Sequence, residues 1–483
     1  MKQSQLAERA QNFYRTSKFA EAEAACRSAL QQNPRDVDAM YWLAMIASRF
    51  GRLDAAAQLL ADASKLRPNS AIILTALGTA LLNSNQLQSA KDAFERAIKL
   101  APRDFDAHHN LAVVFERFGR LPDAADSFSA AVNISPNNAF AHLNLATILR
   151  DVGRLDDAIR HFERAIALDP NLGHAHMGLA WVLLLRGNFK RGWDEYEWRW
   201  RVPGAQMPKF PQPVWDGSAL NGRTIMLHCE QGLGDSIQFS RYSRLLAGQG
   251  GQGGKVILYC PESLVSLLST VPGAVRAVSK WAELGEFDVW LPLMSLPHRF
   301  GTTLETIPRE TPYVSVDAIT ADRWRQRMAG DGAAGLKVGV CWAGNRANIN
   351  DVNRSIPPQM LAPLLGVEGV TFYNLQLGNE AKPAGLIDHT ATIRDFSDSA
   401  AFIQQLDLVI SADTAVAHLA GAVGKPVWTL LPFAPDWRWL LDRDDSPWYP
   451  TMRLFRKAPL EAWPPLIERV RSELVNEVSR RRP

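Results

Sequence analysis

The sequence has few cysteines, no long apolar run and almost no net charge. Its four cysteines, Cys26, Cys229, Cys260 and Cys341, lack the spacing of a metal site or a disulfide framework, so we expect buried free thiols in a reducing compartment. No window approaches the roughly 18 apolar residues of a membrane span, and the polar N-terminus lacks the apolar core of a signal peptide. The net charge of +3 gives no bulk attraction to nucleic acid. These absences predict a cytoplasmic protein without a membrane span or a nucleic-acid partner.

What the sequence does contain is an internal repeat over its first two hundred residues. Five sets of residues recur every 34 positions, which is the period of the tetratricopeptide repeat. The sets are Pro34, Pro68, Pro102, Pro136 and Pro170; Gly51, Asn85, Gly119, Gly153 and Gly187; Ala22, Ala56, Ala90, Ala124 and Ala158; Cys26, Leu60, Phe94, Phe128 and Phe162; and Ala29, Ala63, Ala97, Ala131 and Ala165. We expect five repeats, with a sixth that starts near Gly173 and degenerates after Gly187.

Each set has a physical reason. Glycine or asparagine suits the turn after the first helix of a repeat, because that turn needs a positive φ. Small residues let two helices approach, large apolar residues fill the space between repeats, and proline ends the second helix. Stacked hairpins bury a shared apolar face and form a superhelix with a concave groove. Residues 1–200 are therefore predicted to form an α-helical arm that binds a polypeptide, with a purely structural spacer as the alternative.

Two further sets recur inside this arm. Asn110 and Asn144 share one repeat position facing the groove, where a carboxamide can both donate to and accept from a peptide backbone. This short ladder resembles the arm of the nucleocytoplasmic O-GlcNAc transferases, which hold extended acceptor peptides in this way. His108, His142 and His176 also recur, at a packing position where core or half-buried histidines are expected rather than a zinc site.

A proline-rich segment at about 201–222 predicts a domain boundary. The tryptophans before it, of which Trp193 is the first, are expected to dock the arm onto the next domain, because large exposed aromatic side chains are costly. Beyond it, β-rich runs alternate with helical segments, which predicts parallel sheets in two Rossmann-like lobes, 223–320 and 334–483. The runs are Thr224–Cys229, Lys255–Cys260, Phe287–Leu291, Lys337–Trp342, Val370–Leu375, Leu408–Ser411 and Val427–Leu431.

The first lobe has one strand-to-helix junction that is suited to chemistry. Its residues Glu230, Gly232, Gly234 and Asp235 follow the run that ends at Cys229, and the two glycines let the backbone approach a ligand. An ordinary tight turn in which Asp235 caps the helix is the alternative.

The second lobe has a similar junction at Asp413, Thr414, Ala415 and His418, which open an alanine-rich helix. A helix N-terminus presents free N–H groups and a partial positive charge, which suits a phosphate. His418 is placed to donate to a phosphate oxygen. Helix capping by Asp413 is the alternative explanation.

Several segments together resemble bacterial tetratricopeptide proteins that carry a heptosyltransferase-like (family 9) glycosyltransferase domain. They are EQGLGD at 230–235, CWAGN at 341–345, NRS at 353–355, LQLG at 375–378, SADTAVAHLAGAVGKPVWTLL at 411–431 and DWRWLLDRDDSPWYPTMRLFR at 436–456. The resemblance implies the GT-B architecture and a nucleotide-sugar co-substrate, with no obligatory metal or other cofactor.

The resemblance also implies roles for individual residues. Asp235 matches a candidate general base, with Glu230 as its rival. The donor side is expected to comprise Gly232, Gly234, Arg354, Gln376, Asp413, Thr414, Ala415 and His418. Ala415 stands where heptosyltransferases commonly have glycine, which leaves the donor sugar open.

We therefore expect an inverting glycosyl transfer in which the helix N-terminus and His418 stabilise the leaving phosphate and Asp235 deprotonates the acceptor hydroxyl. The arm is expected to present a protein acceptor, and some relatives of this architecture modify flagellins. The alternatives are a lipopolysaccharide or other glycan glycosyltransferase, and a non-catalytic scaffold with a decayed enzyme lobe.

Overall fold

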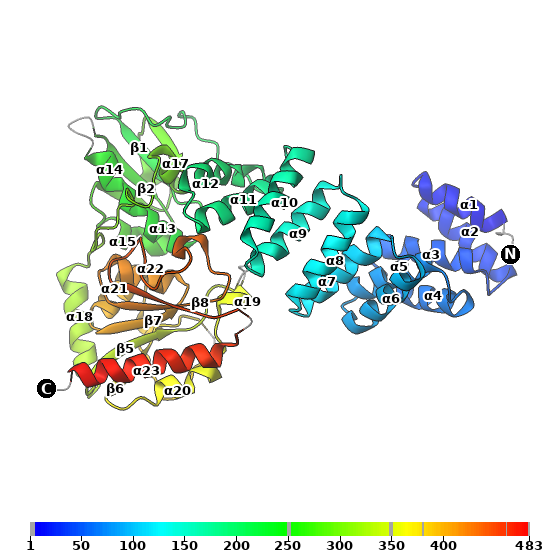
Figure 1. Cartoon of the computed structure of the whole chain (residues 1–483). Coiled ribbons are helices and arrows are strands. Elements are labelled where there is room, and N and C mark those ends of the chain that lie inside the picture. Colours follow the sequence, from blue (N-terminus) through cyan, green and yellow to red (C-terminus); the bar gives the residue numbers. More distant parts are fainter. Residues whose placement is uncertain (1–4, 249–252, 347–350, 379–380, 460, 482–483) are drawn as a thin grey trace. The chain divides into compact units, whose positions relative to one another are not determined.

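The computed structural model describes residues 5–248, 253–346, 351–378, 381–459 and 461–481. The chain forms two compact units, Met1–Gly178 and Leu179–Pro483. The first unit is built of stacked helices, and the second contains two sheets with surrounding helices (Figure 1). The division falls within helix α11 (Gly173–Leu185), so the end of the repeat array belongs to the second unit. The boundary expected at 201–222 stays a prediction.

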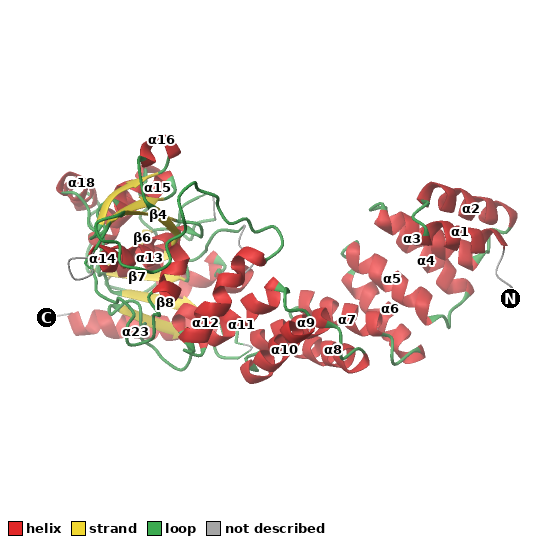
Figure 2. Ribbon diagram, turned by 90° about the horizontal axis from the view of Figure 1, so that it is seen from above, coloured by secondary structure: helices red, strands yellow, loops and turns green. Residues whose placement is uncertain are grey.

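The first unit confirms the predicted helical repeats (Figure 2). Over residues 5–168, all of which are described, the helix pairs are α1 (Gln5–Arg15) with α2 (Phe19–Gln32), α3 (Val37–Arg49) with α4 (Leu53–Leu66), α5 (Ala71–Asn83) with α6 (Leu87–Leu100), α7 (Phe105–Arg117) with α8 (Leu121–Ile134), and α9 (Ala139–Asp151) with α10 (Leu155–Leu168). The next pair is incomplete, because α12 (Phe189–Tyr196) is short and continues as the 3-10 helix η1 (Glu197–Arg201).

The repeated positions have the local geometry that their residue types require. Asn85 has a φ of 61° at its turn, and Gly51 has a φ of 73° at the equivalent turn. The aromatic ring of Phe94 is fully buried, and a Cβ added at Gly78 would lie 2.6 Å from it. A glycine is needed there because the ring occupies the space that a side chain would fill.

The three repeated histidines connect each turn to the helix that follows it. In each case Nε2 lies 3.0–3.1 Å from a proline carbonyl oxygen six residues earlier, so the ring N–H donates to it: His108 to Pro102, His142 to Pro136 and His176 to Pro170. His142 and His176 are buried and His108 is half-buried, as expected. Within the described residues, no group of three or more His, Cys, Asp or Glu side chains is placed to hold a metal ion.

The second unit contains two sheets in which every described strand pairing is parallel. The first sheet has the order β3-β2-β1-β4, with β1 (Thr224–His228), β2 (Lys255–Tyr259), β3 (Ala274–Val278) and β4 (Val289–Pro292). The second has the order β6-β5-β7-β8-β9, with β5 (Leu336–Cys341), β6 (Val370–Asn374), β7 (Leu408–Ala412), β8 (Val427–Leu431) and β9 (Met452–Arg456). We refer to the parts built on these sheets as the first and second lobe.

The predicted β-rich runs all coincide with strands, but β3 and β9 were not predicted. Both are edge strands. The middle of β3 is exposed, and β9 carries arginines at two of its five positions. An edge strand is only partly covered by its neighbours, so its sequence need not show a continuous apolar run.

Each lobe has its own apolar core. All four cysteines of the chain are buried free thiols, as expected. The C-terminal helix α23 (Trp463–Arg481) packs Leu466 and Val470 into the core of the second lobe, with Val338 of β5 and Ile410 of β7. In the described part of the chain, no helix has the length and apolar character needed to cross a membrane.

Candidate active site

The two predicted junctions meet in the second unit. Strand β1 leads into helix α13 (Leu233–Phe239), strand β7 leads into helix α22 (Ala415–Ala422), and the two helices pack against each other. A Cβ added at Gly234 would lie 2.9 Å from Cδ2 of His418 and 3.4 Å from Cα of Ala415. Gly234 therefore allows the first turn of α13 in the first lobe to contact the first turn of α22 in the second lobe.

Thr414, not Asp413, caps helix α22. The Thr414 hydroxyl oxygen accepts the Val416 N–H at 3.2 Å, so the alternative in which Asp413 caps this helix is wrong. The carboxylate of Asp413 instead lies 3.9 Å from Nε2 of His418. Burial, and then the charge of Asp436, raise the pKa of Asp413 to about 6.

Asp235 lies in the first turn of α13 rather than at its cap, which is Gly232. Its Oδ2 accepts the Gly232 N–H at 2.9 Å, and its Oδ1 forms an ion pair with Arg438 of the second lobe. The alternative in which Asp235 caps the helix is therefore partly confirmed: Asp235 is not the N-cap residue, but its carboxylate bonds the N–H of that residue as in a capping box. Burial raises the pKa of Asp235 and the Arg438 charge opposes this. The Asp235 side chain nevertheless remains 24% exposed.

Glu230, the rival base, is enclosed in an ion pair. Its side chain is only 3% exposed, and Oε1 accepts from Nη2 of Arg199 at 3.1 Å and from the Met294 N–H at 3.2 Å. Burial raises the pKa of Glu230, and the Arg199 guanidinium opposes this. Arg199 comes from η1, at the end of the repeat array, so Glu230 helps to anchor that segment to the first lobe.

Arg354 and Gln376 are held against the backbone beside α22. Arg354, at the end of α19 (Asp351–Arg354), donates from Nη1 to the Asp413 carbonyl oxygen at 3.1 Å. Oε1 of Gln376 accepts the backbone N–H groups of Trp342 and Ala343 at 3.2 and 2.9 Å, so this side chain supports the loop that follows β5.

His418 is fixed on two sides. Its Nδ1 lies 3.0 Å from the Tyr449 hydroxyl, and its ring stacks on Trp439 with a centroid distance of 5.4 Å. Burial lowers the pKa of His418 well below its usual range, and the Arg438 charge acts in the same direction. The imidazole is therefore neutral at physiological pH.

Arg438 and Tyr449 were not among the predicted site residues. Both lie within the segment 436–456, so the sequence did contain a signal. Arg438 follows β8 and reaches a carboxylate 203 positions earlier in the chain. No local pattern reports a contact between such distant residues.

Trp193 docks the end of the repeat array within the second unit. Its Nε1 donates to the Thr302 carbonyl oxygen at 2.9 Å, and its ring lies edge-on to Trp437 at 5.2 Å. Trp193 therefore has the packing role expected for the junction tryptophans.

The two asparagines of the predicted ladder lie in the first unit, where each carboxamide bonds across to the preceding repeat. Asn110 donates from Nδ2 to the Thr79 hydroxyl at 3.2 Å. Asn144 donates from Nδ2 to Nε2 of His109 at 2.8 Å. Both side chains are half-buried, so the two rungs are preorganised by their neighbours.

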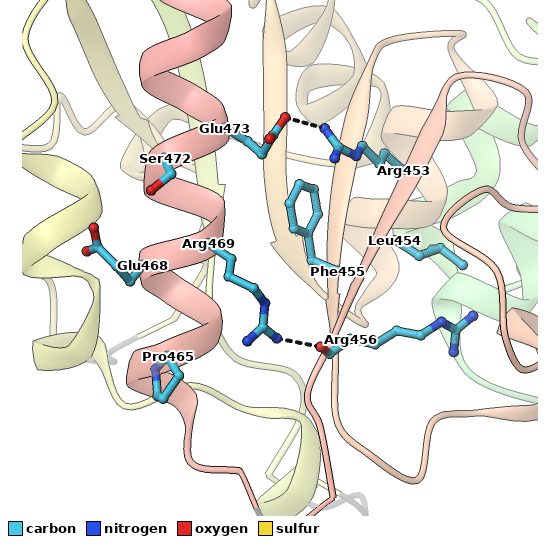
Figure 3. Close-up of a pocket in the computed structure, with 9 residues that line it drawn as sticks. All are labelled: Arg453, Leu454, Phe455, Arg456, Pro465, Glu468, Arg469, Ser472 and Glu473. Carbon is cyan, nitrogen blue, oxygen red and sulfur yellow. Dashed lines mark hydrogen bonds and ion pairs between the residues drawn. The ribbon is translucent and has the colours of Figure 1, made fainter.

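A cavity of about 680 Å³ lies elsewhere in the second lobe, between β9 and α23 (Figure 3). None of the predicted site residues lines it. Its arginines have partners, since Arg453 pairs with Glu473 at 2.7 Å and Arg469 donates to the Arg456 carbonyl oxygen at 2.7 Å. Because none of its lining residues belongs to α13 or α22, this cavity is separate from the N-termini of those two helices.

Comparison with known proteins also separates the helical repeats from the part of the chain that contains the sheets. Residues 8–71, 75–139 and 139–172 match models of the tetratricopeptide repeat. Residues 391–436 match the model of glycosyltransferase family 9 (heptosyltransferase). The chain carries tetratricopeptide repeats and a glycosyltransferase family 9 domain. The family 9 match includes Asp413, Thr414, Ala415 and His418, and ends at Asp436.

Relatives of the whole chain and of its repeats are also known. Protein FlbA of Caulobacter vibrioides is 26% identical over 469 residues, which cover 91% of this chain and 73% of FlbA. Among solved structures, MamA is 24% identical with a TM-score of 0.32 and covers 33% of this chain and 94% of MamA. YrrB, described as a TPR protein with an unusual peptide-binding site, is 21% identical with a TM-score of 0.34 and covers 36% of this chain and 92% of YrrB.

Proposed function

We propose that the second unit is an inverting, metal-independent GT-B glycosyltransferase, and that the repeat arm presents a protein acceptor to it. The observation that carries this proposal is the meeting of α13 and α22, where Gly234 lies against His418 and the first turn of α22, next to the partly exposed carboxylate of Asp235. The family 9 match over the second of these junctions supports the same reaction class.

The α22 side of the site is suited to the leaving phosphate of a nucleotide sugar. The first N–H groups of α22 and its dipole favour an anion, and they are already oriented before the reaction. His418 is neutral, so one ring nitrogen carries a proton and donates without transferring it. Arg354 adds a positive charge next to the Asp413 carbonyl.

Asp235 is the group we assign as general base. It is partly accessible, whereas Glu230 is enclosed by Arg199 and the Met294 N–H. In the proposed step Asp235 takes the proton of the acceptor hydroxyl as that oxygen attacks the anomeric carbon. The bond from this carbon to the donor phosphate breaks, and the phosphate leaves with its electron pair toward α22.

The arm supports a polypeptide as the acceptor. Asn144 keeps its carboxamide oxygen for a peptide N–H while its Nδ2 bonds to His109 of the preceding repeat. Oδ1 of Asn110 lies 3.4 Å from Nδ1 of His109, which leaves this oxygen one further acceptor position for a peptide N–H. Flagellin is the first acceptor to examine. The four buried free thiols favour a reducing compartment, so we place the reaction in the cytoplasm.

A glycan acceptor, such as lipopolysaccharide, is the second candidate, because the matching family is described as heptosyltransferase. The double variant Asn110→Ala with Asn144→Ala separates the two. We expect it to lose protein modification while it keeps donor binding. Unchanged protein glycosylation would count against presentation by the ladder.

Donor binding can be measured directly by calorimetry with a panel of nucleotides and nucleotide sugars, including UDP, GDP, ADP and CMP forms. We expect one family of nucleotides to bind, with unchanged affinity in the presence of EDTA and weaker affinity for Thr414→Val. A chain that binds no member of the panel would contradict the catalytic proposal.

A further inference from the structure

Arg438 connects the two lobes at the proposed general base. It lies in the turn after β8, and its side chain is only 8% exposed. All three guanidinium nitrogens are used: Nε donates to Oε1 of Gln238 at 2.7 Å, Nη1 to Oδ1 of Asp436 at 2.9 Å, and Nη2 to Oδ1 of Asp235. The planar fork therefore has one orientation, and two of its three partners lie on α13 of the first lobe.

The surroundings of Arg438 fix it further. The guanidinium lies over the ring of Trp437 at 4.3 Å from its centroid and over the ring of Phe239 at 5.5 Å. Trp437 in turn packs against Trp193 of the repeat-derived helix α12. A lysine would keep the charge but lose the fork and most of this stacking.

The remaining contact of Asp235 completes its orientation. One oxygen faces Arg438 and the other accepts the Gly232 N–H, so the carboxylate cannot rotate without losing a bond. A carboxylate bound in this way still has free lone pairs, because two oxygens offer about four acceptor positions. The Asp235 carboxylate is therefore already oriented before the acceptor hydroxyl binds.

We propose that Arg438 is a positioning residue of the second lobe that holds Asp235 ionised and oriented as the base. This inference rests on the proposed function. It also links catalysis to the contact between lobes, since the base is in its working state only when the β8–β9 turn reaches α13.

Other charges act on Asp235 as well. The second lobe presents Asp436, whose negative charge opposes Arg438, and Arg354, whose positive charge assists it. Tyr196 of α12 interacts electrostatically with Asp235, and His418 of α22 lies beside Gly234 but is neutral. Burial raises the pKa of Asp235, and the Arg438 charge opposes this shift and so favours the charged form of the base.

The test is the titration of Asp235 in the full chain labelled with [13Cγ]aspartate, with Asp235→Asn used to assign its signal. We expect Arg438→Gln to raise the midpoint of Asp235 by about 1–3 pH units, because a neighbouring arginine lowers an aspartate by that amount. Asp436→Asn is expected to lower the midpoint, because it removes the opposing charge. Arg443→Gln, which breaks an ion pair with Asp445 on the same turn, is the matched control and should leave the midpoint unchanged.

If Arg438→Gln fails to fold, Arg438→Lys decides the proposal, because it keeps a cation but loses the planar fork: the Asp235 midpoint should stay close to wild type while turnover falls. Shifts of opposite sign in Arg438→Gln and Asp436→Asn support the role of Arg438, and a purely structural role would not produce them. A wild-type midpoint in Arg438→Gln, or wild-type turnover in Arg438→Lys where the former does not fold, overturns it. Full turnover by Asp235→Asn would instead overturn the assignment of the base, whatever the midpoints are.

Discussion

The two units of this chain are stabilised in different ways. In the repeat arm, ion pairs such as Arg120 with Asp123 lie at the surface, with side chains that are 50% and 43% exposed. The second unit also has exposed pairs, such as Arg443 with Asp445, but it contains enclosed pairs as well, such as Arg199 with Glu230, whose side chains are 5% and 3% exposed. The loss of one charge should therefore cost little at an exposed pair and much more at the enclosed pair.

The two units also differ in the sequence range of the contacts on which they depend. Each arm hairpin contacts its neighbours in sequence, so stability is close to a sum of similar terms. The site depends on residues from α12, α13, α22 and the β8–β9 turn that meet only after the whole second unit has folded.

The largest expected effect comes from removing α12 and η1 from the second unit. A fragment of residues 223–483 lacks Trp193, Tyr196 and Arg199, all of which are buried in the second unit. We expect it to show no cooperative thermal transition by circular dichroism. A fragment of residues 179–483 is the matched control and should melt cooperatively, so equal behaviour of the two fragments would contradict this division.

The next largest effect is expected from breaking a buried pair. Arg199→Met leaves Glu230 enclosed without its cation, which should lower the free energy of unfolding of the second unit by about 3–5 kcal/mol. Arg120→Met in the arm should cost about 1 kcal/mol or less, because exposed pairs contribute little. Denaturant unfolding measures both, and similar losses would remove the contrast between the units.

A smaller effect, with a defined pH dependence, is expected from Asp413→Asn. The pKa of Asp413 is raised to about 6 in the folded chain, above an unfolded value of about 3.9. Its contribution to stability is therefore fully present below about pH 4 and is lost as the pH rises through 6. Asparagine does not ionise, so the variant should match wild type at pH 4 and exceed it by about 2–3 kcal/mol at pH 8. A stability difference that does not change with pH would contradict this account.

A small effect on stability, with a larger one on acceptor modification, is expected in the asparagine ladder. Asn110→Ala with Asn144→Ala removes one hydrogen bond to Thr79 and one to His109, which should cost about 0.5–1.5 kcal/mol each. Ser129→Ala, which removes a side-chain bond to the Ala125 carbonyl within α8, is a matched control. The control should keep acceptor modification, and loss of modification in both variants would point to a general effect on the arm.

The architecture of the chain could be predicted because its signals are local. The 34-residue period, the positive φ at turns such as Gly51, and the alternation of strands and helices depend on neighbouring residues. The strands that were missed have interrupted apolar patterns, since β3 is exposed at Val275 and Arg276 and β9 carries arginines at two of its five positions.

The candidate site could be located from the sequence, but its connections could not. The junctions at Asp235 and at His418 were both predicted, and their proximity follows from the packing of α13 on α22. The roles of Arg438 and Arg199 depend on contacts across large sequence distances. Capping of α22 by Asp413 was the alternative to a phosphate-binding role, because either residue type can cap a helix, and only the geometry shows that Thr414 does so.

The most direct test of the central claim is a comparison of protein glycosylation in cells that carry the wild-type chain or Asp235→Asn, by intact mass with flagellin examined first. We predict a glycan-sized mass on at least one protein in wild-type cells, its absence with Asp235→Asn, and its reduction with Asn110→Ala and Asn144→Ala. Identical glycosylated proteins in all three would contradict the account.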